Sequence, residues 1–216
     1  MRGMRKRTPA TNFLFVAIMI GFGIEVLTGA WLDVGRLREL GAIVPEYIRA
    51  GQYWRLLTAM FLHGDGTIVG DFLHLGMNLL ALFQLGSLYE IMFGSRRFIL
   101  IYFVAGRGAS ITSALRLDPW GASVGASGAI FGILGAFVFS VLRSPRWRHE
   151  KAAKNLVAQC VFWILANIAI GARIPQIDNA AHIGGLIMGL ILGAVLPHNV
   201  QPPPPREATI EVHPYE

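Results

Sequence analysis

Six long apolar segments constrain the fold of this chain more than any other feature. They fall at about 13–32, 72–93, 98–115, 124–142, 156–174 and 180–196. A segment of about 20 apolar residues can cross the hydrocarbon core of a bilayer as a helix. With 54% hydrophobic and only 15% charged residues, the 216-residue chain is too apolar for an ordinary soluble domain. We therefore predict an all-α membrane protein, a bundle of six transmembrane helices.

The basic residues predict how such a bundle is oriented. The net charge is +6, but Lys and Arg gather in the short connections between segments. In a six-span arrangement twelve of the 19 lie on the side of the two termini and six on the other, while Arg107 falls inside the third segment. Positive residues favour the cytoplasmic side, so both termini are expected there. We expect membrane lipids rather than nucleic acid as partners, and a bacterial inner membrane as the location.

One helical domain accounts for most of the chain. We expect a basic cytoplasmic N-terminus at 1–12, a six-span domain at 13–196, and a cytoplasmic tail at 197–216 that contains four consecutive prolines. The first apolar segment lacks a convincing signal-peptide cleavage site, so we interpret it as a retained span. The long connection at 33–71 lies on the outer side, where we expect short helices packed against the bundle.

Four polar residues stand in the first turns of alternate segments. His74 and Asn78 open the second segment, Ser127 the fourth and His182 the sixth. These three segments all run from the outer to the inner side, so their first turns share one depth. A serine hydroxyl becomes a nucleophile when a base such as histidine takes its proton. His74 and Asn78, spaced i and i+4, share a helix face and can donate hydrogen bonds.

Small residues follow both Ser127 and His182 at four-residue spacing. They are Gly128, Gly132 and Ala136 in one segment and Gly185, Gly189 and Gly193 in the other. Such stripes let membrane helices approach closely, which would bring Ser127 beside His182. A packing face with an incidental serine and histidine is the alternative. Phe131, one turn after Ser127, could wall the histidine ring or merely pack.

A metal site and a catalytic triad are two further possibilities. His63, His74, His182 and Asp178 form a conceivable ligand set, but no helix carries an HExxH-type pair and the lone Cys160 excludes a cysteine-based zinc site. We therefore predict neither a metal nor a cofactor. Asp178 could orient His182 as a third catalytic residue, although a cap at the start of the last helix is the preferred interpretation.

Several motifs together resemble the rhomboid family of intramembrane serine proteases. The matching stretches are Trp54-Arg55, the HLGMN sequence from His74 to Asn78, the GASG sequence around Ser127, and the AHIGG sequence around His182. The resemblance implies that Ser127 is the nucleophile, His182 is the base, and His74 and Asn78 stabilise the oxyanion. It implies a structural role for Trp54 and Arg55, and transmembrane proteins as substrates.

Two other functions compete with proteolysis. A non-proteolytic rhomboid-like protein would bind membrane clients without needing the full Ser, His, His and Asn set. A channel or transporter would carry polar residues along a whole pathway, whereas the cytoplasmic halves of the fourth and sixth segments are almost entirely apolar. The sequence names neither the substrate nor the oligomeric state.

Two ionisable residues lie inside predicted spans. Glu25 in the first and Arg107 in the third have similar expected depths, and charges within a membrane usually pair or line water. At the position of Arg107 the family more often has a small or apolar residue. We hypothesise an ion pair between Glu25 and Arg107; the alternative is that each finds separate water or backbone partners.

Overall fold

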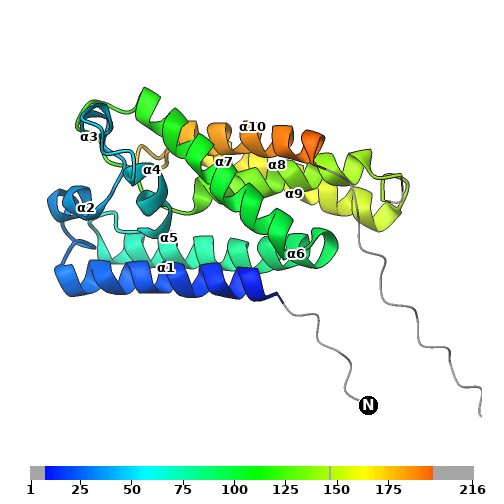
Figure 1. The fold of residues 1–216 in the computed structure, drawn as a ribbon, viewed down its shortest axis with the longest axis horizontal. Coiled ribbons are helices and arrows are strands. Elements are labelled where there is room, and N and C mark those ends of the chain that lie inside the picture. The colour runs from blue at the N-terminus through cyan, green and yellow to red at the C-terminus, as the bar shows by residue number, and fades with distance from the viewer. Residues whose placement is uncertain (1–7, 146, 197–216) are drawn as a thin grey trace, which may run out of the picture.

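The computed structural model describes residues 8–145 and 147–196. Six long helical stretches match the six apolar segments, with ends displaced by at most five residues (Figure 1). They are α1 (Pro9–Thr28), a continuous stretch of α5 (Ile68–Ala81), the π-helical η2 (Leu82–Gly86) and α6 (Ser87–Phe93), then α7 (Ser95–Arg116), α8 (Ser127–Arg143), α9 (Lys151–Gly171) and α10 (Asn179–Val195). The predicted all-α bundle is confirmed. The expectations for 1–7, Arg146 and the proline-rich tail at 197–216 lie outside the described residues.

Local sequence explains several of the helix ends. Helix α1 begins with Pro9, whose missing N–H costs nothing in a first turn, and ends at Gly29 with a φ of 73°. Helix α9 begins at Lys151, ahead of the apolar segment, because apolar length alone does not include a first turn that contains Lys151 and Lys154. Thr67 caps α5 by accepting a hydrogen bond from the N–H of Gly70 at 3.2 Å.

Helices α7, α8 and α10 form the centre of the bundle. Each packs closely against the other two, while α1 contacts η2, α6 and α7, and α9 packs mainly against α8. The interior holds large aromatic side chains, whereas α9 turns apolar residues such as Phe162 and Trp163 outward. An apolar exterior on a well-packed bundle is the surface that lipid requires.

Length separates two helices from the others. Among residues 8–145 and 147–196, four stretches are long and apolar enough to cross a membrane: Pro9–Thr28, Ile68–Phe93, Ser95–Arg116 and Lys151–Gly171. Helices α8 and α10 have 17 residues each. At ~1.5 Å per residue that is about 26 Å, less than the ~30 Å hydrocarbon core. The six-span count and the orientation therefore stay predictions.

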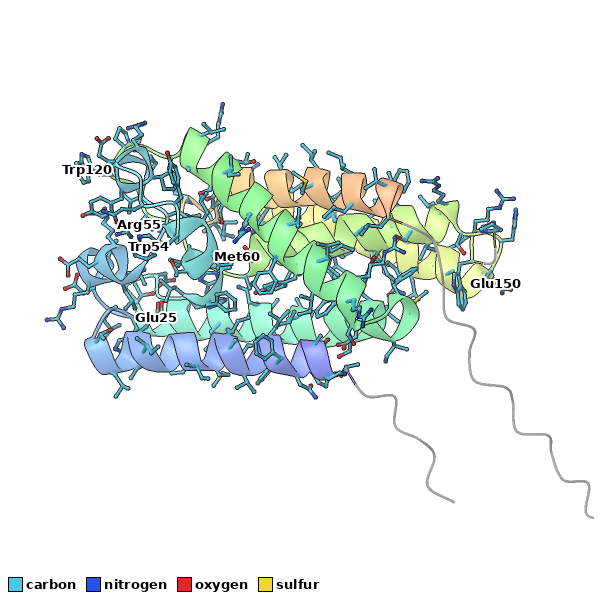
Figure 2. All side chains as sticks on the ribbon, in the orientation of Figure 1. Glu25, Trp54, Arg55, Met60, Trp120 and Glu150 are labelled. Carbon is cyan, nitrogen blue, oxygen red and sulfur yellow. The ribbon has the colours of Figure 1, made fainter. Side chains whose placement is uncertain are left out.

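The long connection folds into short helices at one end of the bundle, as expected. These are α2 (Val34–Leu40), α3 (Pro45–Arg49), α4 (Arg55–Thr58) and the 3₁₀ turn η1 (Ala59–Phe61). The buried Arg55 guanidinium holds them together by donating to the carbonyls of Arg38 and Ala42 and to the side-chain oxygen of Gln52. Figure 2 shows Arg55 and Trp54 at the end where Glu25 also lies. Burial lowers the pKa of Arg55.

The predicted ion pair between Glu25 and Arg107 is wrong. Glu25 is fully buried and accepts hydrogen bonds from the backbone N–H groups of His63 and Gly64. Arg107 is exposed, and no ion pair within 8–145 and 147–196 includes it. The rotation of α7 places Arg107 on an outward stripe with Leu100, Ile111 and Leu115. Similar depths along the two helices therefore do not imply that the side chains of Glu25 and Arg107 face each other.

Candidate active site

Ser127 is the first residue of α8, and the chain reaches it through a tightly held loop. Ile43 and Ser123 exchange two backbone hydrogen bonds of 2.9 and 3.1 Å. The N–H of Gly125 donates to the carbonyl of Ala59 at 2.9 Å, and its φ of 124° favours glycine. These contacts fix the first turn of α8 against the short helices and leave Ser127 half-buried.

His182 lies in the first turn of α10 with its ring directed at Ser127. Its Nε2 is 2.9 Å from Ser127 Oγ, which is hydrogen-bond distance. The ring of Phe131 stacks on the imidazole with centroids 4.2 Å apart and planes at 6°. Phe131 therefore does wall the histidine and restricts its rotation. The structure thus brings together the proposed nucleophile and base, 55 residues apart in sequence.

The two glycine stripes allow this approach. A Cβ at Gly185 would overlap the carbonyl oxygen of Gly128, and a Cβ at Gly189 would overlap that of Gly132. Further along, a Cβ at Gly193 would come within 3.0 Å of the Ala136 carbonyl. Backbones of α8 and α10 therefore meet without intervening side chains, and the predicted packing face is present.

Asp178 caps α10, and its carboxylate does not hydrogen-bond the imidazole of His182, which meets Asp178 only through a backbone bond from the His182 N–H to the Asp178 carbonyl at 3.2 Å. One carboxylate oxygen accepts the N–H of Ala181 at 2.9 Å, and the other accepts the hydroxyl of Ser113. The Nδ1 atom of His182 is buried and has no hydrogen-bond partner among the described residues. The preferred interpretation of Asp178 as a cap is confirmed, and the arrangement is a Ser–His pair rather than a triad.

His74 lies against the loop that leads to Ser127. A Cβ added at Gly125 would be 2.7 Å from His74 Nε2, so this ring occupies the space that glycine leaves open. Its Nδ1 is 3.2 Å from the carbonyl oxygen of His63. A carbonyl only accepts hydrogen bonds, so Nδ1 carries a proton.

Asn78 lies one turn further along α5 and is nearly buried. Its side-chain amide donates to the carbonyl of His74 at 2.9 Å. This bond uses one of the two N–H groups of the amide and leaves the second for another acceptor.

His63 also belongs to this cluster, although the sequence suggested no function for it beyond that of a conceivable metal ligand. Its ring is fully buried, and Nε2 accepts the N–H of Ala126, the residue before the serine, at 3.3 Å. Burial is the main cause that lowers the pKa of His63 to about 3, and His74 acts in the same direction. The ring is therefore neutral at physiological pH, as an acceptor must be. In the sequence, the indication for His63 was that it lies between two of the matching motifs, Trp54-Arg55 and the HLGMN sequence that begins at His74.

The conceivable metal ligands serve other functions in this structure. His63 accepts a backbone N–H, Asp178 caps a helix, and His182 faces Ser127. Within the part of the chain that the structure describes, no group of three or more His, Cys, Asp or Glu is placed to hold a metal ion.

This arrangement suits nucleophilic catalysis. The hydroxyl of Ser127 has a base at hydrogen-bond distance, and the N–H of Ser127 is among the first of α8. N–H groups in a first turn lack intrahelical acceptors and lie at the positive end of the helix dipole. They can therefore bind an oxygen that gains negative charge during a reaction.

Comparison with known proteins gives consistent matches. The rhomboid domain family matches residues 50–199. The chain is 38% identical to the rhomboid protease GluP of Bacillus subtilis over 189 residues, which cover 87% of this chain and 35% of GluP. It is 36% identical to RHOMBOID-like protein 5 of Arabidopsis thaliana, covering 76% of this chain and 50% of the relative. Identity to the rhomboid protease AarA of Providencia stuartii is 31%, covering 74% and 63%. The chain thus spans less than two thirds of each of these relatives.

Proposed function

Because this chain belongs to the rhomboid family, we propose that it is an intramembrane serine endopeptidase. Its substrates would be other membrane proteins, cleaved in or near their transmembrane helices. The single observation that carries the proposal is the 2.9 Å contact between Ser127 Oγ and His182 Nε2. The two side chains meet directly, without a third residue between them. A protein that only binds membrane clients has no chemical use for a serine hydroxyl paired with a base.

The reaction follows from the positions of these two residues. His182 Nε2 takes the hydroxyl proton as Ser127 Oγ attacks the carbonyl carbon of the scissile peptide bond. The resulting tetrahedral intermediate expels the amine, which receives its proton from His182. A water molecule then attacks the acyl ester with His182 again as base, and Ser127 regains its proton. The stacked ring of Phe131 keeps Nε2 directed at Oγ through both halves.

Three groups are candidates to stabilise the oxyanion: the N–H of Ser127, His74 and Asn78. The contact with the His63 carbonyl places a proton on His74 Nδ1, so Nε2 donates a second hydrogen bond only when the ring is cationic. Asn78 would use the amide N–H that does not bond the His74 carbonyl. The backbone N–H of Ser127 donates whether His74 is neutral or cationic. We therefore assign to it the part of the oxyanion stabilisation that does not depend on pH.

The family and the apolar helices make this an integral membrane protein. Both termini would be cytoplasmic, with the active site towards the outer face. The short helices α8 and α10 would begin below the membrane surface, because neither is long enough to span the hydrocarbon core. Such a position would let water reach Ser127 from the side of the long connection.

Labelling by a fluorophosphonate tests the proposal directly. The oxygen of a serine activated by a base displaces fluoride from the probe and forms a phosphonate ester, so the purified chain in detergent should be labelled at Ser127 and Ser127→Ala should not. Ser123→Ala is a matched control in the same loop, since Ser123 contacts Ile43 through its backbone alone. Cleavage of a panel of single-span membrane proteins should be lost in the same variant. An unlabelled wild-type protein would favour a non-proteolytic client-binding function.

A further inference from the structure

Glu25 is a buried carboxylate that the reaction does not use. It lies on α1 (Figure 2) with no exposed surface. Its Oε1 accepts the N–H groups of His63 at 2.8 Å and Gly64 at 2.9 Å. Its Oε2 lies 3.1 Å from the same His63 N–H. A buried polar group is costly unless it is hydrogen-bonded, so the N–H groups of His63 and Gly64 are what stabilise this carboxyl inside the bundle.

The segment held by Glu25 contacts both sides of the active site. The carbonyl oxygen of His63 meets His74 Nδ1 at 3.2 Å, and the ring of His63 accepts the N–H of Ala126 at 3.3 Å. A chain of hydrogen bonds therefore runs from α1 through one residue to α5 and to the first turn of α8. The Ala126 peptide immediately precedes the Ser127 N–H.

We propose that Glu25 and His63 are positioning residues of the active site. They hold the backbone that orients His74 and the Ser127 N–H towards the oxyanion. The inference rests on the proposed function, and neither residue touches the reacting atoms. Catalytic groups must be held to within roughly 0.5 Å, and a 1 Å displacement can cost about 100-fold in rate.

The chain contains a matched control for Glu25. Glu90, on α6, is also a buried carboxylate that accepts two successive backbone N–H groups, those of Ala10 at 2.9 Å and Thr11 at 2.8 Å. These amides belong to the opposite end of α1 from Glu25, about 20 Å away at ~1.5 Å per residue. Glu90 therefore stabilises the bundle by the same kind of contact without a link to Ser127.

The experiment measures fluorophosphonate labelling of Ser127 at saturating probe, well below the unfolding temperature of each variant. Glu25→Leu should lower the limiting rate about 10- to 100-fold with little change in the half-saturating probe concentration. Glu25→Gln should stay within a few-fold of wild type, because one amide oxygen can accept both N–H groups. Glu90→Leu should lower the unfolding temperature but keep the labelling rate of the folded protein.

Two substitutions of His63 keep the proposal testable if Glu25→Leu does not fold. His63→Gln places an acceptor where Nε2 lies and should retain labelling, whereas His63→Asn is too short to reach Ala126 and should lose it about 10-fold or more. Equal rates for Gln and Asn, or an equal loss in Glu90→Leu, would overturn the proposal. Wild-type protein that fails to label would instead overturn the proposed function.

Discussion

At the scale of single residues, three buried ionisable side chains of this bundle have backbone groups among their hydrogen-bond partners. The carboxylates of Glu25 and Glu90 accept backbone N–H groups, and Arg55 donates to backbone carbonyls. Such partners do not show in a sequence, where only other side chains suggest themselves. This is why Arg107 was a plausible but wrong partner for Glu25. A backbone partner also fixes the position of the chain, which is what an active site requires.

The buried ring of His63 predicts a pH dependence of stability. Its pKa is lowered from 6.5 to about 3, chiefly by burial, so the unfolded chain binds a proton between these values that the folded chain does not. The contribution of His63 to stability should therefore fall as the pH drops below about 6.5, by up to ~1.4 kcal/mol per pH unit, and this loss should level off near pH 3. Thermal unfolding in detergent between about pH 7.5 and 4.5 measures it. His63→Gln cannot titrate and should show a shallower decline; identical slopes would contradict this assignment.

At the scale of elements, the sequence predicted what depends on local pattern. Apolar length located all six long helices, and the spacing of Gly185 and Gly189 predicted the contact of α10 with α8. It also placed Ser127, His182 and His74 at one end of the bundle. The function of His63 was out of reach, because it depends on the fold of the long connection and on a bond to the backbone of Ala126. The shortness of α8 and α10 was not predicted, because the apolar segments at 124–142 and 180–196 were both interpreted as full spans.

Two glycine substitutions separate helix contact from helix propensity. A Cβ at Gly189 would overlap the Gly132 carbonyl, whereas a Cβ at Gly23 on α1 meets nothing within 4 Å. Gly189→Ala should therefore separate α10 from α8, lowering stability by about 1–3 kcal/mol and slowing labelling of Ser127. Gly23→Ala should be neutral or stabilising by up to about 1 kcal/mol, because alanine favours helix. Unfolding temperatures and labelling rates measure both, and equal effects of the two changes would refute the close-contact argument.

At the scale of the whole molecule, the position of the site restricts which substrates can react. Ser127 and His182 meet in the first turns of two helices too short to span the membrane core. A substrate that arrives as an intact helix keeps its scissile carbonyl in an i to i−4 hydrogen bond, and lipid supplies no replacement partner. If the proposed function holds, such a segment would have to unwind near the end that meets the site before Ser127 could attack.

This requirement predicts that helix-weakening residues near the cut promote cleavage. Replacing one Gly in that part of a cleaved substrate by Leu should slow cleavage about fivefold, since the two differ by nearly 1 kcal/mol in helix propensity and 1.4 kcal/mol corresponds to tenfold. Rates are measured on the purified chain, with Ser127→Ala as the blank. The same replacement in a shortened peptide that forms no helix should change the rate little, because no helix has to open. An equal slowing in both substrates would mean that Ser127 and its surroundings select the side chain itself, and not the ease of unwinding.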